Sequence, residues 1–188
     1  MEKISELSVF LPTYNEEKSI ASVSAGVLAV LSAVADRYEL IIVNDGSTDH
    51  TAEIVERLVQ NDNHVRCIHH QNNRGYGAAL KSGLYACRYE WISFIDADGQ
   101  FDFSEIDRFI IKQKETDADL VIGYYLSRAV PIYRKLNSFL WQTLIFLFFG
   151  LRVRDIDCGF KLISRKVVEA TPDLESERGA FKIGRAHV

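Results

Sequence analysis

The chain has few cysteines and no cluster of cysteine and histidine residues. Its 188 residues include three cysteines, Cys67, Cys87 and Cys158, at wide spacings and without a CxxC pair. The five histidines form no HExxH or similar pattern, and we expect them at the surface or in turns. These absences exclude a disulfide framework and a structural zinc site, and they fit a reducing, cytosolic setting.

The sequence also lacks a long apolar run and a surplus of positive charge. A membrane span needs about 18–20 apolar residues, and no run reaches that length; the strongly apolar and aromatic stretch Phe139–Phe149 has 11. The charged start, MEKISELSVF, has no apolar signal-peptide core. The net charge of −4 argues against non-specific nucleic-acid binding, which needs a basic face. We therefore expect no nucleic-acid partner.

Strand and helix patterns alternate along the chain, and 47% hydrophobic residues are enough for a core. Apolar runs predict strands over Leu7–Pro12, Glu39–Asn44, Val65–His69, Trp91–Ile95 and Leu120–Gly123. Helical spacing predicts helices over Ser19–Val34, Asp49–Val59, Tyr76–Cys87 and Phe103–Thr116. This alternation predicts an α/β fold with a mostly parallel central sheet and helices on both faces.

Polar clusters follow three of the predicted strands: Thr13–Glu16, Asp45–Ser47 and Asp96–Gln100. In open parallel sheets, ligands bind at the carboxyl ends of the strands, so these clusters predict one site. Asp96 and Asp98, one residue apart after a buried strand, can hold Mg²⁺ or Mn²⁺ through carboxylate oxygens. A DxD in a turn can equally be an Asx-turn or a helix cap.

The other strand ends allow two interpretations each. Asp45 can accept hydrogen bonds from a base or ribose, whereas Ser47, Thr48 or Asp49 can cap the following helix. The segment from Pro12 to Glu16 can wrap a base or be an ordinary loop. The glycines of 72–77 precede a helix whose N-terminus can host an anion, but this GxG fits neither a dinucleotide fingerprint nor a P-loop.

The composition changes in the last third of the chain, which combines a strongly apolar, aromatic run with basic residues. Residues 133–150, YRKLNSFLWQTLIFLFFG, predict either a core helix or an amphipathic helix at a membrane surface. A basic stretch that includes Lys161 and Arg165 follows. The segment Asp155–Lys161, DIDCGFK, can supply a base or a phosphate-orienting carboxylate, or it can be a polar turn.

Five segments together resemble the glycosyltransferase family 2 enzymes: VFLPTYNEE, IIVNDGSTD, NRGYGAALKSG, FIDADGQ and RDIDCGFKLISR. Their order and spacing match over residues 6–182. Within the family the chain is most similar to the polyprenyl-phosphate sugar transferases of the dolichyl-phosphate mannose synthase type. One departure is Gly123-Tyr124-Tyr125, where relatives often have Gly-Tyr-Arg, so one phosphate-facing arginine is missing.

The resemblance implies a nucleotide-sugar-binding GT-A fold and assigns site residues. Asp96 and Asp98 would hold Mg²⁺ or Mn²⁺ on the diphosphate, and the catalytic carboxylates would be Asp98 and Asp157, the latter as a base or an acceptor-orienting group. Nucleotide and substrate contacts would come from Pro12, Tyr14, Asn15, Glu16, Asp45, Ser47, Lys81, Asp96, Ala97, Gln100, Arg128 and Arg134.

The resemblance also implies an activity: an inverting transfer of a hexose from a UDP- or GDP-sugar to a polyprenyl phosphate. It would occur on the cytoplasmic side of the membrane, and the protein could form a homo-oligomer. The alternatives are a family 2 transferase with a saccharide acceptor and a nucleotide-sugar-binding fragment without turnover.

We expect three regions in the chain. Residues 1–124 would form the nucleotide-sugar and metal-binding core, and 125–182 an acceptor-side segment with the interfacial helix. Residues 183–188, IGRAHV, correspond to a reading frame of a sequencing-adapter oligonucleotide, and we expect a non-native tail on a truncated chain.

Overall fold

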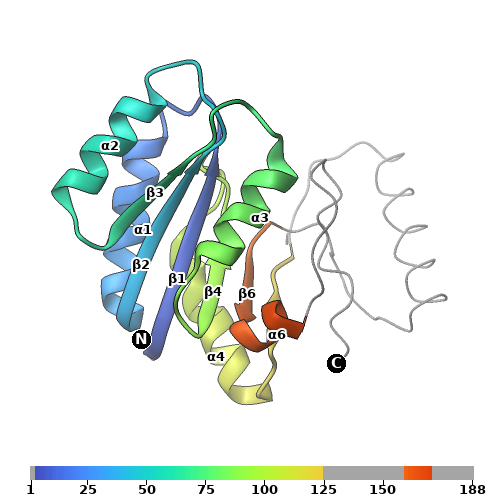
Figure 1. Ribbon diagram of the computed structural model, residues 1–188. Helices are drawn as coiled ribbons and strands as arrows, with labels where there is room; N and C mark the ends of the chain where they lie inside the picture. Colours follow the sequence, from blue (N-terminus) through green and yellow to red (C-terminus); the bar gives the residue numbers. More distant parts are fainter. Residues whose placement is uncertain (1–2, 125–158, 171–188) are drawn as a thin grey trace, which may run out of the picture.

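A computed structural model describes residues 3–124 and 159–170, which form an α/β unit around one sheet (Figure 1). The sheet has six strands in the order β3-β2-β1-β4-β6-β5. The strands are β1 (Ile4–Thr13), β2 (Ala35–Asn44), β3 (Val65–His69), β4 (Trp91–Phe94), β5 (Leu120–Ile122) and β6 (Lys161–Ser164). β1 to β4 are mutually parallel, and β6 runs antiparallel to β4 and β5. The predicted class and mostly parallel sheet are confirmed.

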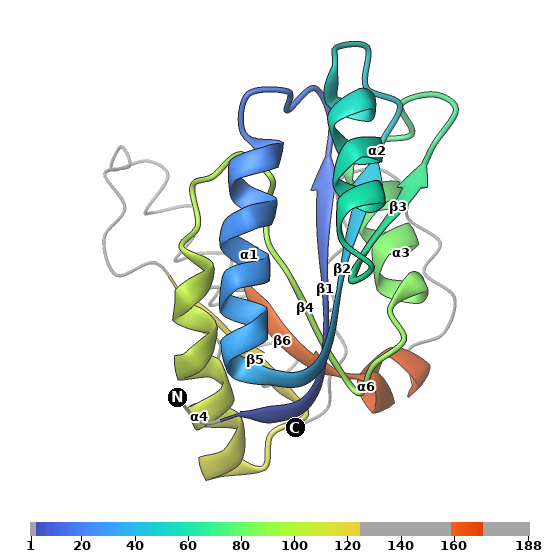
Figure 2. The ribbon, with the colours of Figure 1, turned by 90° about the vertical axis from the view of Figure 1, so that its left-hand side faces the viewer.

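Helices cover both faces of the sheet (Figure 1, Figure 2). On one face lie α1 (Ile20–Val34), α2 (Thr51–Asn61), the 3-10 turn η1 (Phe103–Glu105) and α4 (Ile106–Thr116). On the other lie α3 (Tyr76–Ala86) and α6 (Arg165–Ala170). The sheet therefore separates two apolar clusters, one around Leu31 and Ile110 and one around Phe10 and Leu84. Burial on both faces is why the runs VFLP of β1 and LIIV of β2 are continuously apolar.

Helix α3 lies unusually close to β1. A Cβ added at Gly83 would fall 2.2 Å from Cδ2 of Phe10, so only glycine fits at this position. The close approach brings the N-terminal end of α3 towards the strand ends that carry the polar clusters (Figure 1).

Among the residues that the structure describes, the predicted elements agree with it except for shifted bounds and for β6. β1 and β2 extend further towards their N-terminal ends than predicted, and the helix predicted from Phe103 begins with η1, where Asp102 accepts the Ser104 N–H. No strand was expected at β6, which continues the segment that one interpretation treated as a polar turn. It lies between β4 and β5, so the sheet uses residues beyond the 1–124 range expected for the core.

The amino-terminal end of the sheet is pinned by a buried charge. Glu39 accepts hydrogen bonds from Ser8 Oγ (2.7 Å), from the Arg88 N–H (2.8 Å) and from the guanidinium of Arg66 (2.7 Å). Every polar atom of this carboxylate is thus used for structure, and ligand chemistry is left to the other end of the sheet. None of the described helices is long and apolar enough to cross a membrane. The helix predicted over 133–150 lies outside the described residues.

Candidate active site

The loop after β1 is fastened to the loop after β2. Asn15 has a left-handed φ of 56°, its N–H donates to Ser47 Oγ (3.0 Å), and its Oδ1 accepts the Thr48 N–H (2.8 Å). The N–H of Glu16 donates to Thr51 Oγ1 (2.9 Å). Asn15 and Ser47, which the resemblance places at the nucleotide, thus join the two loops that would surround it.

Pro12 and Tyr14 differ in accessibility. Pro12 is buried in β1 opposite Val43, so its side chain supports the strand end. Tyr14 is 45% exposed at the beginning of the loop, where its ring can stack on a base. Glu16 is half-buried, and its Oε2 accepts a hydrogen bond from Ser19 Oγ (2.6 Å).

Asp45 directly follows β2 in a buried position, and its carboxylate is already bonded inside the protein. Oδ1 lies 2.5 Å from Nδ1 of His70 and accepts the Arg74 N–H (3.0 Å), and Oδ2 accepts the Gly75 N–H (2.8 Å). The expectation that the histidines lie at the surface or in turns is wrong for His70, whose side chain is only 5% exposed. Its ring can be buried because both nitrogens have polar partners, Asp45 after β2 and Ser82 on α3.

Asp96 is the carboxylate on which the described site converges. Tyr76 Oη donates to Asp96 Oδ1 over 2.8 Å. Burial raises the pKa of Asp96 above its ordinary value; the Tyr76 hydrogen bond opposes this shift, and the charges of Asp98 and Glu16 add to it. The cation of Lys161 lowers the pKa. A divalent cation would relieve this crowding of negative charge.

Asp98 sits in an exposed turn. Its Oδ1 accepts the Gln100 N–H (2.9 Å), and Gly99 takes a left-handed φ of 76°. The Asx-turn interpretation is therefore right as a description of the local structure, and it holds the Asp98 carboxylate at the surface. Ala97, between the two acids, is buried, so it anchors the turn by its methyl group.

The donor set fits a cation shared with a ligand. The described residues contain no group of three or more His, Cys, Asp or Glu side chains arranged to hold a metal by themselves. Mg²⁺ and Mn²⁺ in phosphate-binding sites commonly take one or two carboxylates and complete their shell with phosphate and water oxygens. Asp96 and Asp98 match that donor set.

The remaining predicted residues are placed only in part. Lys81 is half-buried on α3, within the segment that begins with Tyr76. Gly159 comes beside the acids, because a Cβ added there would lie 3.4 Å from Asp96 Oδ2. Arg128, Arg134 and Asp157 lie outside the described residues.

Two residues of the site were not expected. Tyr76 reaches Asp96 across 20 positions of sequence, and Lys161, 9% exposed, lies in register with Phe94 of β4 with Nζ 5.6 Å from its ring centroid. The motif NRGYG gave a hint of the role of Tyr76. This tyrosine directly follows the loop and begins a helix, which places it beside a strand end.

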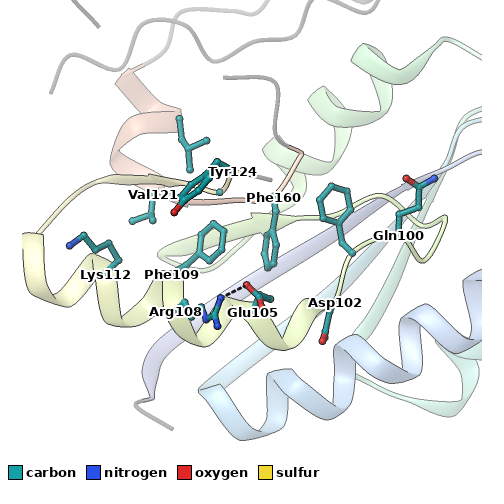
Figure 3. A pocket seen from close by; sticks show the side chains of 12 residues that line it. Gln100, Asp102, Glu105, Arg108, Phe109, Lys112, Val121, Tyr124 and Phe160 are labelled. Atoms are coloured by element: carbon teal, nitrogen blue, oxygen red, sulfur yellow. Dashed lines mark hydrogen bonds and ion pairs between the residues drawn. The ribbon is translucent and has the colours of Figure 1, made fainter. Parts of the chain in front are cut away.

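A pocket of about 510 Å³ opens beside the Asp98 turn (Figure 3). It begins at Gln100, and its floor contains Phe109 and Phe160, whose rings stack at 4.5 Å. On its rim, Arg108 is already paired with Glu105 (3.1 Å). The pocket therefore offers apolar surface and a polar edge next to Gln100, the residue whose N–H bonds to Asp98.

Comparison with known proteins decides the family. The family model for Glycosyl transferase family 2 matches residues 8–171. The chain belongs to glycosyltransferase family 2. It is 33% identical over 90% of its length to an undecaprenyl-phosphate 4-deoxy-4-formamido-L-arabinose transferase of Photorhabdus laumondii, and 31% identical over 94% to a dolichyl-phosphate beta-glucosyltransferase of Dictyostelium discoideum. It spans 52% and 60% of these two relatives, respectively.

Solved structures agree on the fold of this family 2 chain. Glucosyl-3-phosphoglycerate synthase of Mycobacterium tuberculosis, in complex with phosphoglyceric acid, superposes with a TM-score of 0.66 at 23% identity, covering 89% of this chain and 60% of that one. A mannosyltransferase of Pyrobaculum calidifontis, in complex with GDP-Man and Mn²⁺, gives 0.61 at 19% identity, covering 87% and 45%. The fold is thus of the GT-A type, as expected.

Proposed function

We propose that the chain carries the donor site of an inverting glycosyltransferase that moves a hexose from a nucleoside-diphosphate sugar to a polyprenyl phosphate. The observation that carries the proposal is the pairing of Asp96 with Asp98 at the strand ends of a family 2 fold. Polyprenyl-phosphate sugar transferases among the relatives support the acceptor class.

The described residues divide the work of binding the donor. Tyr14 offers its ring to the base, and the loop pair joined by Asn15 and Ser47 encloses the nucleoside. Asp96 and Asp98 would hold Mg²⁺ or Mn²⁺, which supplies positive charge to the diphosphate when bound. Support for a divalent cation comes from the fold neighbour in complex with GDP-Man and Mn²⁺. Gln100, from the same turn as Asp98, is one of the residues that line the pocket (Figure 3).

The reaction needs little proton transfer. A phosphate oxygen of the acceptor forms a bond to the anomeric carbon while the bond from that carbon to the diphosphate oxygen breaks, so the configuration inverts and the nucleoside diphosphate leaves. An ionised phosphate is already a nucleophile, and catalysis can rest on positioning and charge complementarity. We assign Arg128 and Arg134 to phosphates and Asp157 to orienting the acceptor.

The pocket beside Gln100 supports an acceptor with an apolar part. Its floor of Phe109 and Phe160 suits isoprenoid carbons, and the paired Arg108 leaves the rim electrically balanced. We place the reaction on the cytoplasmic side of the membrane, with residues 133–150 at the bilayer surface. A homo-oligomer is compatible with this arrangement.

A saccharide acceptor is the second candidate. Tyr124, 47% exposed at the pocket, could stack on a sugar ring, and Gln100 and Asp102 could bond its hydroxyls. A competition between polyprenyl phosphate and a short oligosaccharide separates the two acceptors, because only the true acceptor accumulates labelled sugar.

Calorimetry tests the donor site. We expect a UDP- or GDP-sugar to bind in the presence of Mn²⁺, and Asp98→Asn to weaken that binding at least about 10-fold. The matched control is Asp62→Asn: Asp62 Oδ1 accepts the His64 N–H two residues ahead, as Asp98 does with Gln100, but in the turn before β3. Equal loss in both variants, or binding that persists in Asp98→Asn, would contradict the assignment.

A further inference from the structure

Three strand ends behind the site are connected by one path of hydrogen bonds. It begins at Ser82 on α3, whose Oγ lies 2.8 Å from Nε2 of His70 after β3. Nδ1 of His70 lies 2.5 Å from Asp45 Oδ1 at the end of β2. Asp45 then accepts the N–H groups of Arg74 and Gly75, which precede α3.

The path ends at the acid of the donor site. Gly75, with a φ of 95°, is followed directly by Tyr76, the first residue of α3. Tyr76 Oη donates to Asp96 Oδ1 (2.8 Å) at the end of β4. The carboxylate of Asp45 holds the backbone of Gly75 in place. Because Tyr76 is the next residue, this also sets the position from which the Tyr76 side chain extends towards Asp96.

The inner part of the path has no room to relax. The side chains of Asp45 and His70 are 4% and 5% exposed, so water cannot replace the bonds they make. The loop after β2 also packs tightly against the loop between β3 and α3, because a Cβ on Gly46 would fall 2.4 Å from the Asn72 carbonyl carbon. A buried carboxylate with satisfied partners is a rigid support, whereas one that loses a partner must rearrange.

We propose that Tyr76 is a positioning residue for Asp96, and that the buried Asp45–His70 pair sets the position of Tyr76. The bond from Tyr76 engages Oδ1 and so fixes the orientation of the Asp96 carboxylate, which leaves Oδ2, on the side of Gly159, as the oxygen for the ligand. This inference rests on the proposed donor site. It gives Asp45 a structural task in addition to any contact with the nucleotide.

The first test compares two tyrosines on the same helix. Tyr76 is 46% exposed and Tyr85 is 45% exposed, so Tyr76→Phe and Tyr85→Phe each remove one hydroxyl from equally exposed residues. We expect Tyr76→Phe to weaken Mn²⁺-dependent binding of UDP or GDP about tenfold by calorimetry, while the variant keeps a cooperative unfolding transition. Tyr85→Phe should match the wild type. Equal affinities in all three proteins would overturn the proposal.

The second test separates the two ends of the path. His70→Asn keeps a donor where Nδ1 stood, whereas His70→Leu removes it. We expect His70→Leu to reproduce the Tyr76→Phe loss and His70→Asn to restore most of the affinity. The double variant Tyr76→Phe/His70→Leu should lose no more than either single variant, because both break one path. Additive losses would show that the residues act independently.

A ligand-free measurement keeps this inference distinct from the proposed function. Hydrogen exchange of the Arg74 and Gly75 amides reports their bonds to Asp45 directly. We expect faster exchange in His70→Leu than in His70→Asn. Failure of the wild type to bind any nucleotide would refute the donor site while this comparison still tests the path, and equal exchange in both variants would refute the path. Should His70→Leu not fold, Tyr76→Phe and His70→Asn carry the test.

Discussion

At the scale of single residues, the Asp96 carboxylate assigned to the proposed donor site lowers the stability of the fold at neutral pH. This carboxylate is partly buried near the charges of Asp98 and Glu16, and burial above all raises its pKa above the ordinary value of 3.8. The folded protein therefore holds the Asp96 proton more tightly than the unfolded chain does. Ionisation at neutral pH weakens the fold, and this penalty disappears below the ordinary carboxyl range.

Asp96→Asn should therefore stabilise the ligand-free protein while it destroys the donor site. We expect a higher thermal midpoint than the wild type at pH 7, and a gain that shrinks as the pH falls through the folded pKa towards 3.8. The amide can still accept the Tyr76 hydrogen bond, so the change removes charge alone. Calorimetric scans across pH measure the gain; a lower midpoint at pH 7 would contradict this account.

Single residues also show how far sequence reasoning reaches. The Asx-turn was one of the alternatives that the sequence left open for the DxD motif, and the Asp98–Gln100 bond is of this local kind. The burial of His70 and the Tyr76–Asp96 bond could not be predicted in this way, since each depends on elements separated by 20 or more positions. A pattern in the sequence identifies which residues carry chemistry, but the sheet order decides which of them meet.

At the scale of elements, the close packing of α3 against β1 depends on Gly83. Gly83→Ala places a Cβ 2.2 Å from Cδ2 of Phe10, so the helix must move away from the strand. We expect a loss of about 1–3 kcal/mol in the free energy of unfolding, measured with urea. Gly26→Ala on α1 is the control: its Cβ meets nothing within 4 Å, and it should gain about 0.5–1 kcal/mol. A loss in both, or in neither, would contradict the packing argument.

Strands and helices could be predicted from the sequence where their burial produces a long, regular pattern of apolar residues. β1, β2 and α1 carry continuous or periodic apolar residues, and their positions agree with the prediction to within a few residues. β6 has four residues, begins with Lys161 and ends with Ser164, so no run or alternation distinguishes it from a polar turn. It is a strand because β4 and β5 present open edges on either side of it.

At the scale of the whole molecule, β6 joins the described segment 159–170 to the sheet formed by residues 3–124. It separates β4 from β5, and its Leu162 is fully buried in the main core. A chain that ends after Tyr124 leaves the edges of β4 and β5 without this partner. We expect it to lose the cooperative urea transition of the full chain, followed by circular dichroism. A sharp transition at the full chain's midpoint would show that β6 contributes nothing to the core.

The central claim is that Asp96 and Asp98 support sugar transfer to a lipid phosphate. The most direct measurement supplies the full chain with a labelled UDP- or GDP-sugar, Mn²⁺ and polyprenyl phosphate, and counts the label in the lipid fraction. We predict a labelled lipid that requires Mn²⁺ and falls about 100-fold or more in Asp98→Asn, with Asp62→Asn like the wild type. A protein that binds the nucleotide sugar but labels no lipid, or an Asp98→Asn variant that labels it at the wild-type rate, would contradict the account.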